Sequence, residues 1–191
     1  MSDSPKLLIY VSAVTPRINY TFRHICTHIL GLKIKFTSKI EEFIAHEGMK
    51  LSYGKQKLGN ELFIQSSGLL SEQGFTDVEV RVSKWENTVC FFRSSKESDL
   101  PFDIFAASFY MLSRYEEYLP HVKDEHGRYP SSESLAYRKK FLEQPVVDIW
   151  ALKFKAKLIE RFDYIEFPAR IYNTKNILAV AEAYKYKKKG I

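Results

Sequence analysis

The sequence has few cysteines and no long apolar run. Its two cysteines, Cys26 and Cys90, are far apart and lack the spacing of zinc ligands. Free cysteine behaves as a small apolar residue, so we expect both to be reduced and buried. No apolar stretch approaches the roughly 20 residues of a membrane helix, and residues 7–11 are too few for the core of a signal peptide. We therefore expect a cytoplasmic protein without membrane contact.

Motifs that mark common enzymes are also missing. The sequence has no glycine-rich phosphate loop, no nucleophile elbow and no zinc helix with two histidines. His24, Cys26 and His28 resemble a metal motif, but on a helix Cys26 points roughly 200° away from His24. Two histidines alone are a weak site. We therefore expect neither a metal nor a cofactor.

The charge is basic without being extreme. The chain has 191 residues, the size of one domain, and a net charge of +6. Without four lysines near its end the charge falls to +2: Lys185, Lys187, Lys188 and Lys189. Lysines alternate with aromatic and apolar residues at 153–157 and 184–189, a pattern that proteins binding single-stranded nucleic acid use. No nucleic-acid-binding motif accompanies it, so we expect no nucleic-acid partner.

The first fifty residues alternate between strand and helix patterns. Residues 7–11 form a short apolar strand, and Pro16 suits the first turn of a helix. Apolar residues at helical spacing continue to Gly31, which suits a C-terminal cap. Residues 33–37 alternate as a strand does, and Ser38 can cap a second helix. The order strand–helix–strand–helix is typical of a parallel pair of strands.

The middle of the chain predicts antiparallel strands, and its last part predicts helices. Four short segments are rich in strand-forming residues: 50–53, 61–65, 78–83 and 88–93. Glu86 and Asn87 suit a tight turn between the last two. Two apolar stripes at helical spacing mark helices: after Pro101, which suits the start of a helix, Phe102, Phe105, Phe109 and Leu112, and, after Pro145, Ile149, Leu152, Ala156 and Ile159. The sequence thus predicts a mixed α/β (α+β) fold with a central mixed sheet of five to six strands.

Glu116 is the most informative polar residue. It lies four residues after Leu112 and so prolongs an apolar stripe, and a carboxylate at the edge of a core needs an ion pair or a hydrogen bond. Arg114 is only two residues away and is not its neighbour on a helix. The partner must therefore come from elsewhere, from Arg128, Arg138 or a tyrosine hydroxyl. Three interpretations stay open: an ion pair that fixes the following loop, a polar pocket that recognises a sugar or a partner, and catalysis.

The loop after Pro120 gathers acids and imidazoles. General acid–base chemistry or metal binding would require these side chains to converge. Gly127 makes the loop flexible, so a solvated connection is the simpler interpretation. The candidate binding site, to which we assign no catalytic residue, combines this loop with the segment around Glu116: Arg114, Glu116, Glu117, Asp124, His126 and Arg128.

The segment from Asp99 to Pro120 resembles part of an uncharacterised domain in bacterial polysaccharide deacetylase proteins of the Bacteroidetes type. In those proteins the domain precedes the deacetylase domain. Further segments resemble the same domain: 61–66, 124–128 followed by 134–137, and 145–152. The resemblance covers nearly the whole chain. It implies a non-catalytic accessory role, structural or glycan-binding, with the deacetylase catalytic domain as partner, and it implies no mechanism for the domain itself.

Near the end of the chain the resemblance extends to the start of a deacetylase domain. There the first strand of the family ends in two aspartates, one a base and one a metal ligand, and a tract like residues 183–190 follows. Ala179 and Ala181 occupy the positions of those aspartates. Alanine can neither bind a metal nor take a proton, so the resemblance implies that this chain is not itself a working deacetylase.

We therefore expect residues 1–168 to form a single α/β accessory domain. Residues 169–191 are expected to be a tail or linker that resembles the start of a deacetylase domain. Two alternatives come from other functional classes. One is an independent hydrolase that uses Glu116, Asp124 and His126; the other is a basic module that binds nucleic acid or an anionic polymer.

Overall fold

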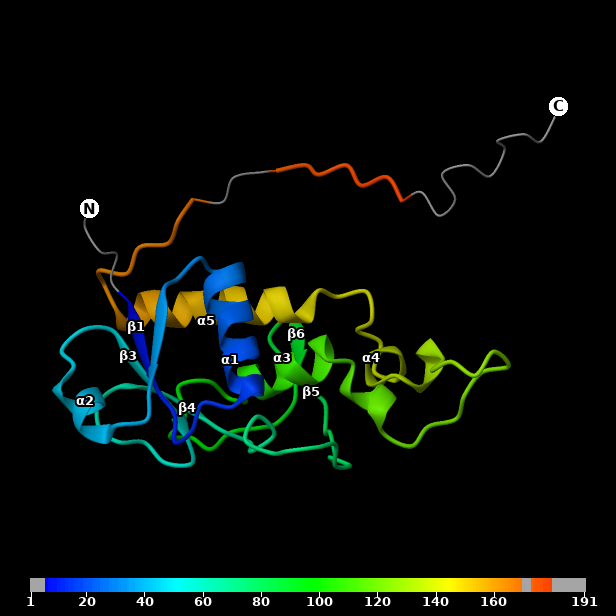
Figure 1. Cartoon of the computed structure of the whole chain (residues 1–191), viewed down its shortest axis with the longest axis horizontal. Helices are drawn as coiled ribbons and strands as arrows, with labels where there is room; N and C mark the ends of the chain where they lie inside the picture. The colour runs from blue at the N-terminus through cyan, green and yellow to red at the C-terminus, as the bar shows by residue number, and fades with distance from the viewer. Residues whose placement is uncertain (1–5, 170–172, 180–191) are drawn as a thin grey trace, which may run out of the picture.

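Four strands from the first part of the chain form a parallel sheet. The computed structural model describes residues 6–169 and 173–179 (Figure 1). The strands pair in the order β2-β1-β3-β4, and every pair is parallel. They are β1 (Leu7–Tyr10), β2 (Ile34–Thr37), β3 (Lys50–Gly54) and β4 (Leu62–Gln65). The inner strands β1 and β3, and also β4, are buried over consecutive residues, as is usual for parallel strands covered on both faces.

Helices α1 (Pro16–Phe22) and α2 (Ile40–Ala45) confirm the predicted strand–helix–strand–helix beginning. Thr15 caps α1, because its hydroxyl oxygen accepts a hydrogen bond from the N–H of Ile18 at 3.1 Å. The cap residue of α2 is Lys39 rather than the predicted Ser38, and no side chain caps that helix. α1 supplies the crossover that a parallel pair of strands requires.

The first helix does not end with its α-helical part. It continues as the π-helix η1 (Arg23–Ile29), and Gly31 follows with a φ of +73°. The predicted C-terminal cap is confirmed, since glycine adopts this left-handed conformation without strain. A Cβ atom at Gly31 would also collide with the ring of Pro168. The glycine therefore lets the segment after the last helix pack against the end of η1.

The predicted antiparallel middle is wrong in its pairing. β3 and β4 are parallel neighbours joined by residues 55–61, which contain no helix. Residues 78–82 form no strand, and antiparallel pairing is confined to the hairpin of β5 (Ser83–Trp85) and β6 (Thr88–Cys90). The predicted turn is confirmed, with Glu86 at a φ of 51°. The described residues therefore hold a four-stranded sheet and a separate two-stranded sheet instead of one sheet of five to six strands.

α3 (Ile104–Leu112) is the central helix. It begins later than the predicted start at Pro101, because the carboxylate of Asp103 caps it by accepting a hydrogen bond from the N–H of Ala106 at 3.0 Å. The predicted apolar stripe describes only part of its surface, since residues 104–110 are all buried. A helix that is buried on every side lies inside the core, and here α1 and α5 contact it.

The longest helix, α5 (Val146–Arg161), packs against α3, η1 and β6 and runs along the length of the body (Figure 1). The predicted stripe is the wrong face, because Leu152 and Ile159 are exposed. Apolar residues occur on both faces of this helix, and periodicity alone could not choose between them. The indole N–H of Trp150 fixes the orientation by donating to the carbonyl oxygen of Val89 at 2.8 Å. The buried face consists of Val146, Val147, Trp150, Ala151, Phe154 and Leu158.

Three short helices complete the chain's second half: η2 (Tyr115–Tyr118), η3 (Ser131–Glu133) and α4 (Leu135–Arg138). α4 lies at the end of the molecule opposite to the parallel sheet (Figure 1). The mixed α and β composition is thus as predicted, although the size and order of the sheet are not. Both cysteines are free and buried, as predicted. Among the described residues, no helix combines the length and apolar character needed to cross a membrane.

Candidate functional site

The site begins where α3 ends. Arg114 adopts a left-handed conformation with a φ of 52°, which turns the chain from α3 into η2. The buried Tyr115 follows, and its hydroxyl group accepts a hydrogen bond from the N–H of Thr76 at 3.0 Å and donates to the carbonyl oxygen of Thr76 at 3.2 Å. This pair of hydrogen bonds holds the segment around Thr76 against η2. Two segments that are distant in the sequence thereby form the walls of one site.

Glu116 projects from η2 toward α4. Its Oε1 accepts a hydrogen bond from the N–H of Leu135 at 2.8 Å and lies 4.0 Å from Nη2 of Arg138. The hydroxyl group of Tyr110 is also close enough to lower the pKa of this carboxyl group. The expected partner of Glu116 therefore comes from elsewhere in the chain, and it is Arg138 together with a tyrosine rather than Arg128.

Burial shapes the electrostatics around Glu116. Removal from water raises the pKa of its carboxyl group, against the lowering effects of the Leu135 N–H, the Arg138 charge and the Tyr110 hydroxyl. Burial, and next the nearby carboxylate of Glu116, raise the pKa of Tyr129 to about 12. The same two causes raise the pKa of Tyr110. Both phenols therefore stay protonated at neutral pH and can donate hydrogen bonds.

Two cavities border Glu116. The larger has a volume of about 370 Å³, and the smaller has a volume of about 270 Å³. Tyr110, Glu116 and Tyr129 line both of them, so these three side chains stand in the wall between the cavities. The larger cavity has polar and apolar walls, and its remaining lining is Asp77, Val78, Val80, Leu119, Pro120, His121, Glu133, Leu135 and Arg138.

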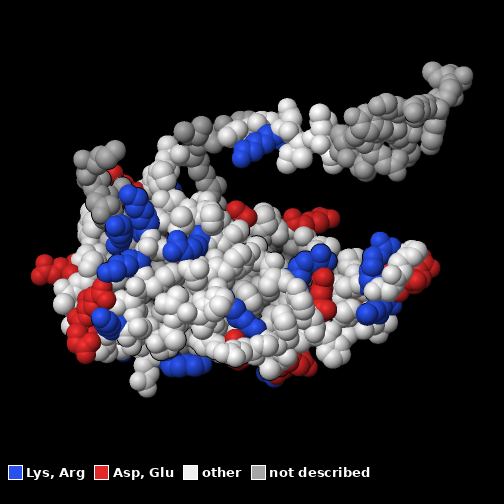
Figure 2. Space-filling view, viewed as in Figure 1, with Lys and Arg blue, Asp and Glu red and all other residues white. Residues whose placement is uncertain are grey.

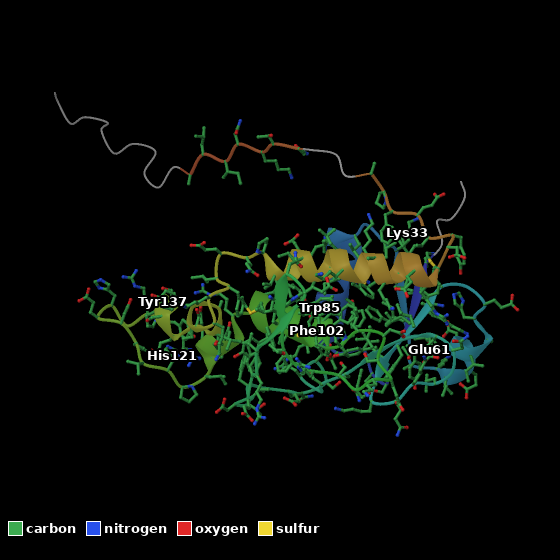
Figure 3. All side chains as sticks on the ribbon, turned by 180° about the vertical axis from the view of Figure 1, so that it is seen from behind. Lys33, Glu61, Trp85, Phe102, His121 and Tyr137 are labelled. Carbon is green, nitrogen blue, oxygen red and sulfur yellow. The ribbon has the colours of Figure 1, made fainter. Side chains whose placement is uncertain are left out.

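The larger cavity combines donors, acceptors and apolar surface. Protonated phenols and a guanidinium group donate hydrogen bonds, carboxylates accept them, and valine, leucine and proline side chains supply the apolar contact. A concave site of this composition suits a small or segmented polar ligand. Figure 3 shows His121 and Tyr137 at this end of the molecule, with Lys33 and Glu61 at the other end.

The predicted loop residues do not join this site. Asp124 Oδ1 accepts hydrogen bonds from the N–H groups of His126 at 2.9 Å and Arg128 at 2.7 Å, which closes a turn on itself. The Arg128 guanidinium also pairs with Asp124 at 3.6 Å. None of these three residues lines either cavity at Glu116. The loop extends away from the body of the protein (Figure 1), as the solvated-connection interpretation predicts.

Arg114 and Glu117 lie nearer to the site but face its smaller cavity. They form an ion pair with each other across one turn of η2, and both line only the cavity of about 270 Å³. Of the six candidate residues, the structure therefore places Glu116 at the larger cavity, Arg114 and Glu117 beside it, and Asp124, His126 and Arg128 in a separate turn.

Sequence reasoning missed Tyr110, Tyr129, Asp77, Glu133 and His121 as members of the site. Tyr110 is hidden in the apolar helix α3, and its position six residues before Glu116 would put it on a different face of a continuous helix, so no local pattern places it at the site. Asp77 directly precedes residues 78–83, which the sequence analysis predicts to be a strand. Tyr129 and Glu133 lie in a polar loop whose path no local pattern reveals.

The structure also shows the surroundings of the metal-like motif and of Ala179. Cys26 points into the core and is fully buried, and burial raises the pKa of its thiol. The rings of His24 and His28 lie 6.2 Å apart between centroids, and no cluster of three or more metal-ligating side chains occurs in the part of the chain that the structure describes. Ala179 is exposed, whereas Ala181 and the tract 183–190 lie outside the described residues.

The lysines of α5 have partners on the protein. Lys153 lies over the ring of Trp85 and pairs with Glu86. Lys155 lies over the ring of Phe167, at 4.5 Å from its centroid. Figure 2 shows basic and acidic side chains interspersed on the face that it displays, without a continuous basic surface. This arrangement does not favour the basic-module alternative on that face.

Comparison with known proteins places the chain in a family without a known role. No curated protein and no solved structure matches it. One family model does match, described as a family of unknown function (DUF7033), and the match spans residues 7–163. These residues include the whole sheet, the central helix and the site at Glu116. The chain therefore belongs to the family of unknown function DUF7033.

Proposed function

We propose that this chain is a non-catalytic accessory domain that binds a glycan in the larger cavity at Glu116, as part of a polysaccharide-deacetylase-like protein. Membership of an uncharacterised domain family is compatible with this proposal. The segment from Asp99 to Pro120, whose resemblance suggests the deacetylase connection, contains α3, η2 and Glu116 itself. The resemblance and the site thus fall on the same part of the chain.

The cavity around Glu116 is the observation that carries the binding proposal. Sugars present a dense set of hydroxyl groups, each of which both donates and accepts hydrogen bonds, on a ring with apolar C–H faces. The cavity offers the carboxyl group of Glu116, the hydroxyl groups of Tyr110 and Tyr129, and the guanidinium of Arg138 beside apolar walls. A few polar groups that fix orientation within a largely preformed pocket are typical of small-molecule sites.

The independent-hydrolase alternative has less support. Acid–base catalysis requires two groups that can reach one substrate together. The hydrolase hypothesis assigns those roles to Glu116, Asp124 and His126. Asp124 already accepts two backbone hydrogen bonds within its own turn, and neither it nor His126 lines a cavity at Glu116. Binding without turnover fits these positions better.

Titration of the chain with a panel of defined oligosaccharides, followed by isothermal titration calorimetry, tests this function. The panel includes N-acetylated and de-N-acetylated glucosamine oligomers and cello-oligosaccharides. We expect at least one to bind, and Glu116→Gln to weaken its binding about tenfold, because a hydrogen bond to a charged acceptor becomes a neutral one. The amide oxygen of glutamine can still accept from Leu135 N–H, so the variant should fold.

Glu125→Gln is the matched control, because Glu125 is an exposed glutamate in the neighbouring loop that does not line the cavity. Equal losses in both variants, or no binding of any glycan, would contradict the proposal. Release of acetate from an N-acetylated oligomer by this chain with added zinc would contradict its non-catalytic part. A reading frame without a deacetylase domain in the encoding gene would contradict the proposed partner.

A further inference from the structure

The larger cavity is acidic although the chain as a whole is basic. Three carboxyl groups line it, from Asp77, Glu116 and Glu133, against the single guanidinium of Arg138. The whole chain carries a net charge of +6. Charges that line a concave site act on a ligand more strongly than charges spread over a convex surface, because the low-dielectric walls focus the field. The cavity therefore favours a ligand with positive charge.

An exposed pair of aromatic rings, the aromatic edge, is carried by two segments that line this cavity. The rings of Phe75 and Tyr118 stack with centroids 4.2 Å apart and planes 7° apart. They are 47% and 62% exposed, respectively. Phe75 lies two residues before Asp77, and Tyr118 directly precedes Leu119, and both Asp77 and Leu119 line the cavity. The stacked pair is thus attached to both walls of the site.

The aromatic pair is independent of the carboxyl groups and indicates a ligand with a flat apolar face. Large aromatic side chains gain most of their stabilisation from burial, so two that remain this exposed on segments lining a pocket offer unused contact area. The outer face of such a ring accepts the C–H groups of a sugar ring, and the ring quadrupole also attracts a cation. Both properties match one type of glycan.

We infer that the cavity and its aromatic edge select a glycan that carries free, protonated amines, such as a de-N-acetylated glucosamine polymer. One sugar ring lies on the outer face of Tyr118, and the amine of a neighbouring unit reaches the carboxylates of Asp77 and Glu133. Acetylation removes the positive charge and leaves the carboxylates without a counter-charge. This inference rests on the proposed glycan-binding function and adds to it the chemical class of the glycan.

The selection has a direct structural rationale. An N-acetyl group would desolvate the carboxylates without pairing them, which costs free energy. A simple polyamine would pair with the carboxylates but would not use the aromatic edge. Arg138 opposes the amine, because its guanidinium carries the same charge and already lies 4.0 Å from the carboxylate of Glu116. Removal of that charge should therefore improve the binding of an amine.

Calorimetry on the complete chain with matched ligands tests the inference. The ligands are a glucosamine oligomer, the N-acetylglucosamine oligomer of equal length, a cello-oligosaccharide and spermidine, at a pH below the pKa of the sugar amine. We expect the glucosamine oligomer to bind best. Glu133→Gln and Asp77→Asn should each weaken it about two- to fivefold, as expected for an exposed charge pair, and Glu125→Gln should leave it unchanged.

Two further variants give readouts that a merely structural role would not produce. Arg138→Gln should raise the affinity for the glucosamine oligomer relative to that for the cello-oligosaccharide about two- to fivefold. Tyr118→Ala should weaken every glycan about fivefold but not spermidine. Tyr164→Ala is the control, because Tyr164 is 56% exposed, close to the exposure of Tyr118, and does not line the cavity.

The outcomes separate this inference from the proposed function. Equal affinity for the three glycans, each weakened by Glu116→Gln, would overturn the amine selection and leave glycan binding intact. Spermidine binding as tightly as the glucosamine oligomer, with no effect of Tyr118→Ala, would overturn the glycan as ligand. The absence of binding by any ligand would overturn both the inference and the proposed function. The expected order of affinities with the expected variant effects would support both.

Discussion

Asp103 and Glu116 are acids that flank the two ends of α3, the first buried and the second partly buried. They differ in how completely hydrogen bonds from the protein satisfy their carboxyl groups. Asp103 is fully buried and precedes the helix, where its two oxygens accept hydrogen bonds from the N–H of Ala106, the N–H of Ser67 and the hydroxyl group of Tyr53, at 2.8–3.0 Å. Burial raises its pKa despite these three donors. None of the three donors is charged, and two of them, Tyr53 and Ala106, are themselves buried.

Glu116 follows the other end of α3 and has less complete support. One backbone N–H donates to it at 2.8 Å, and the nearest guanidinium is 4.0 Å away. Its carboxyl group also borders two cavities, so a ligand can reach it. A raised pKa alone therefore does not separate the two carboxyl groups. The number of fixed donors and the neighbouring space indicate a structural role for Asp103 and a binding role for Glu116.

Replacement of Asp103 should have the largest effect on stability. Asp103→Ala removes the cap of α3 and leaves the buried Tyr53 hydroxyl and the partly buried Ser67 N–H without their acceptor. Loss of a cap and of buried partners together should lower the free energy of unfolding by about 3–4 kcal/mol. Urea denaturation followed by circular dichroism measures it.

Two companion variants show whether the Asp103 network acts as a unit. Tyr53→Phe removes one of its three donors and should cost about 1 kcal/mol. Asp77→Ala removes an exposed acid and should cost less than about 0.5 kcal/mol. A loss below that of Tyr53→Phe for Asp103→Ala would show that Asp103 is not the centre of the network.

The raised pKa of Asp103 should make the stability of the fold depend on pH, and this is the next largest expected effect. Its pKa is higher in the folded chain than in the unfolded chain, so the folded state binds the extra proton. Such a group stabilises the fold below its unfolded pKa, and this contribution is lost as the pH rises through the folded pKa. Asp103→Asn removes this titration. The advantage of the wild-type chain over this variant should therefore increase as the pH falls from about 7 toward about 4.

Denaturation midpoints of the two proteins across that pH range measure this difference. Other acids titrate in the same range, among them Glu61, whose pKa is lowered by hydrogen bonds from Ser52 and Leu58 against the opposing effect of burial. Their contributions occur in both proteins and cancel in the comparison. A difference that shrinks as the pH falls would mean that Asp103 is stabilised as a carboxylate.

The two carboxyl groups also show what the sequence could and could not predict. Glu116 was identifiable because a glutamate continues an apolar stripe and so requires a partner. Asp103 was missed because Pro101, two residues earlier, is itself a strong helix-start signal. The helix does not begin at Pro101 because Phe102 forms a β-bridge with Arg93, which keeps the chain extended up to Asp103.

Which strands pair with each other was harder to predict than where the helices and strands lie in the sequence. The beginning of the fold followed from local caps and spacing, but the parallel arrangement of β3 and β4 did not, because alternation of side chains is the same in both kinds of sheet. The cavity could not be predicted from the sequence for a related reason. Asp77, Tyr110 and Arg138 come from three separate segments, and only tertiary packing such as the Tyr115–Thr76 hydrogen bonds brings them together.

The turn at Asp124 should show the smallest effect and is the sharpest check on the division between structural and binding acids. Asp124 accepts two backbone hydrogen bonds in an exposed loop, so Asp124→Ala should cost about 0.5–1 kcal/mol of stability. It does not line the cavity, so glycan affinity should stay within about twofold of wild type, whereas Glu116→Gln should lower affinity with little loss of stability. Denaturation and calorimetry on the same protein samples measure both quantities. If Asp124→Ala weakened the glycan as strongly as Glu116→Gln, the loop would belong to the site, and completeness of hydrogen bonding would no longer distinguish the two kinds of acid.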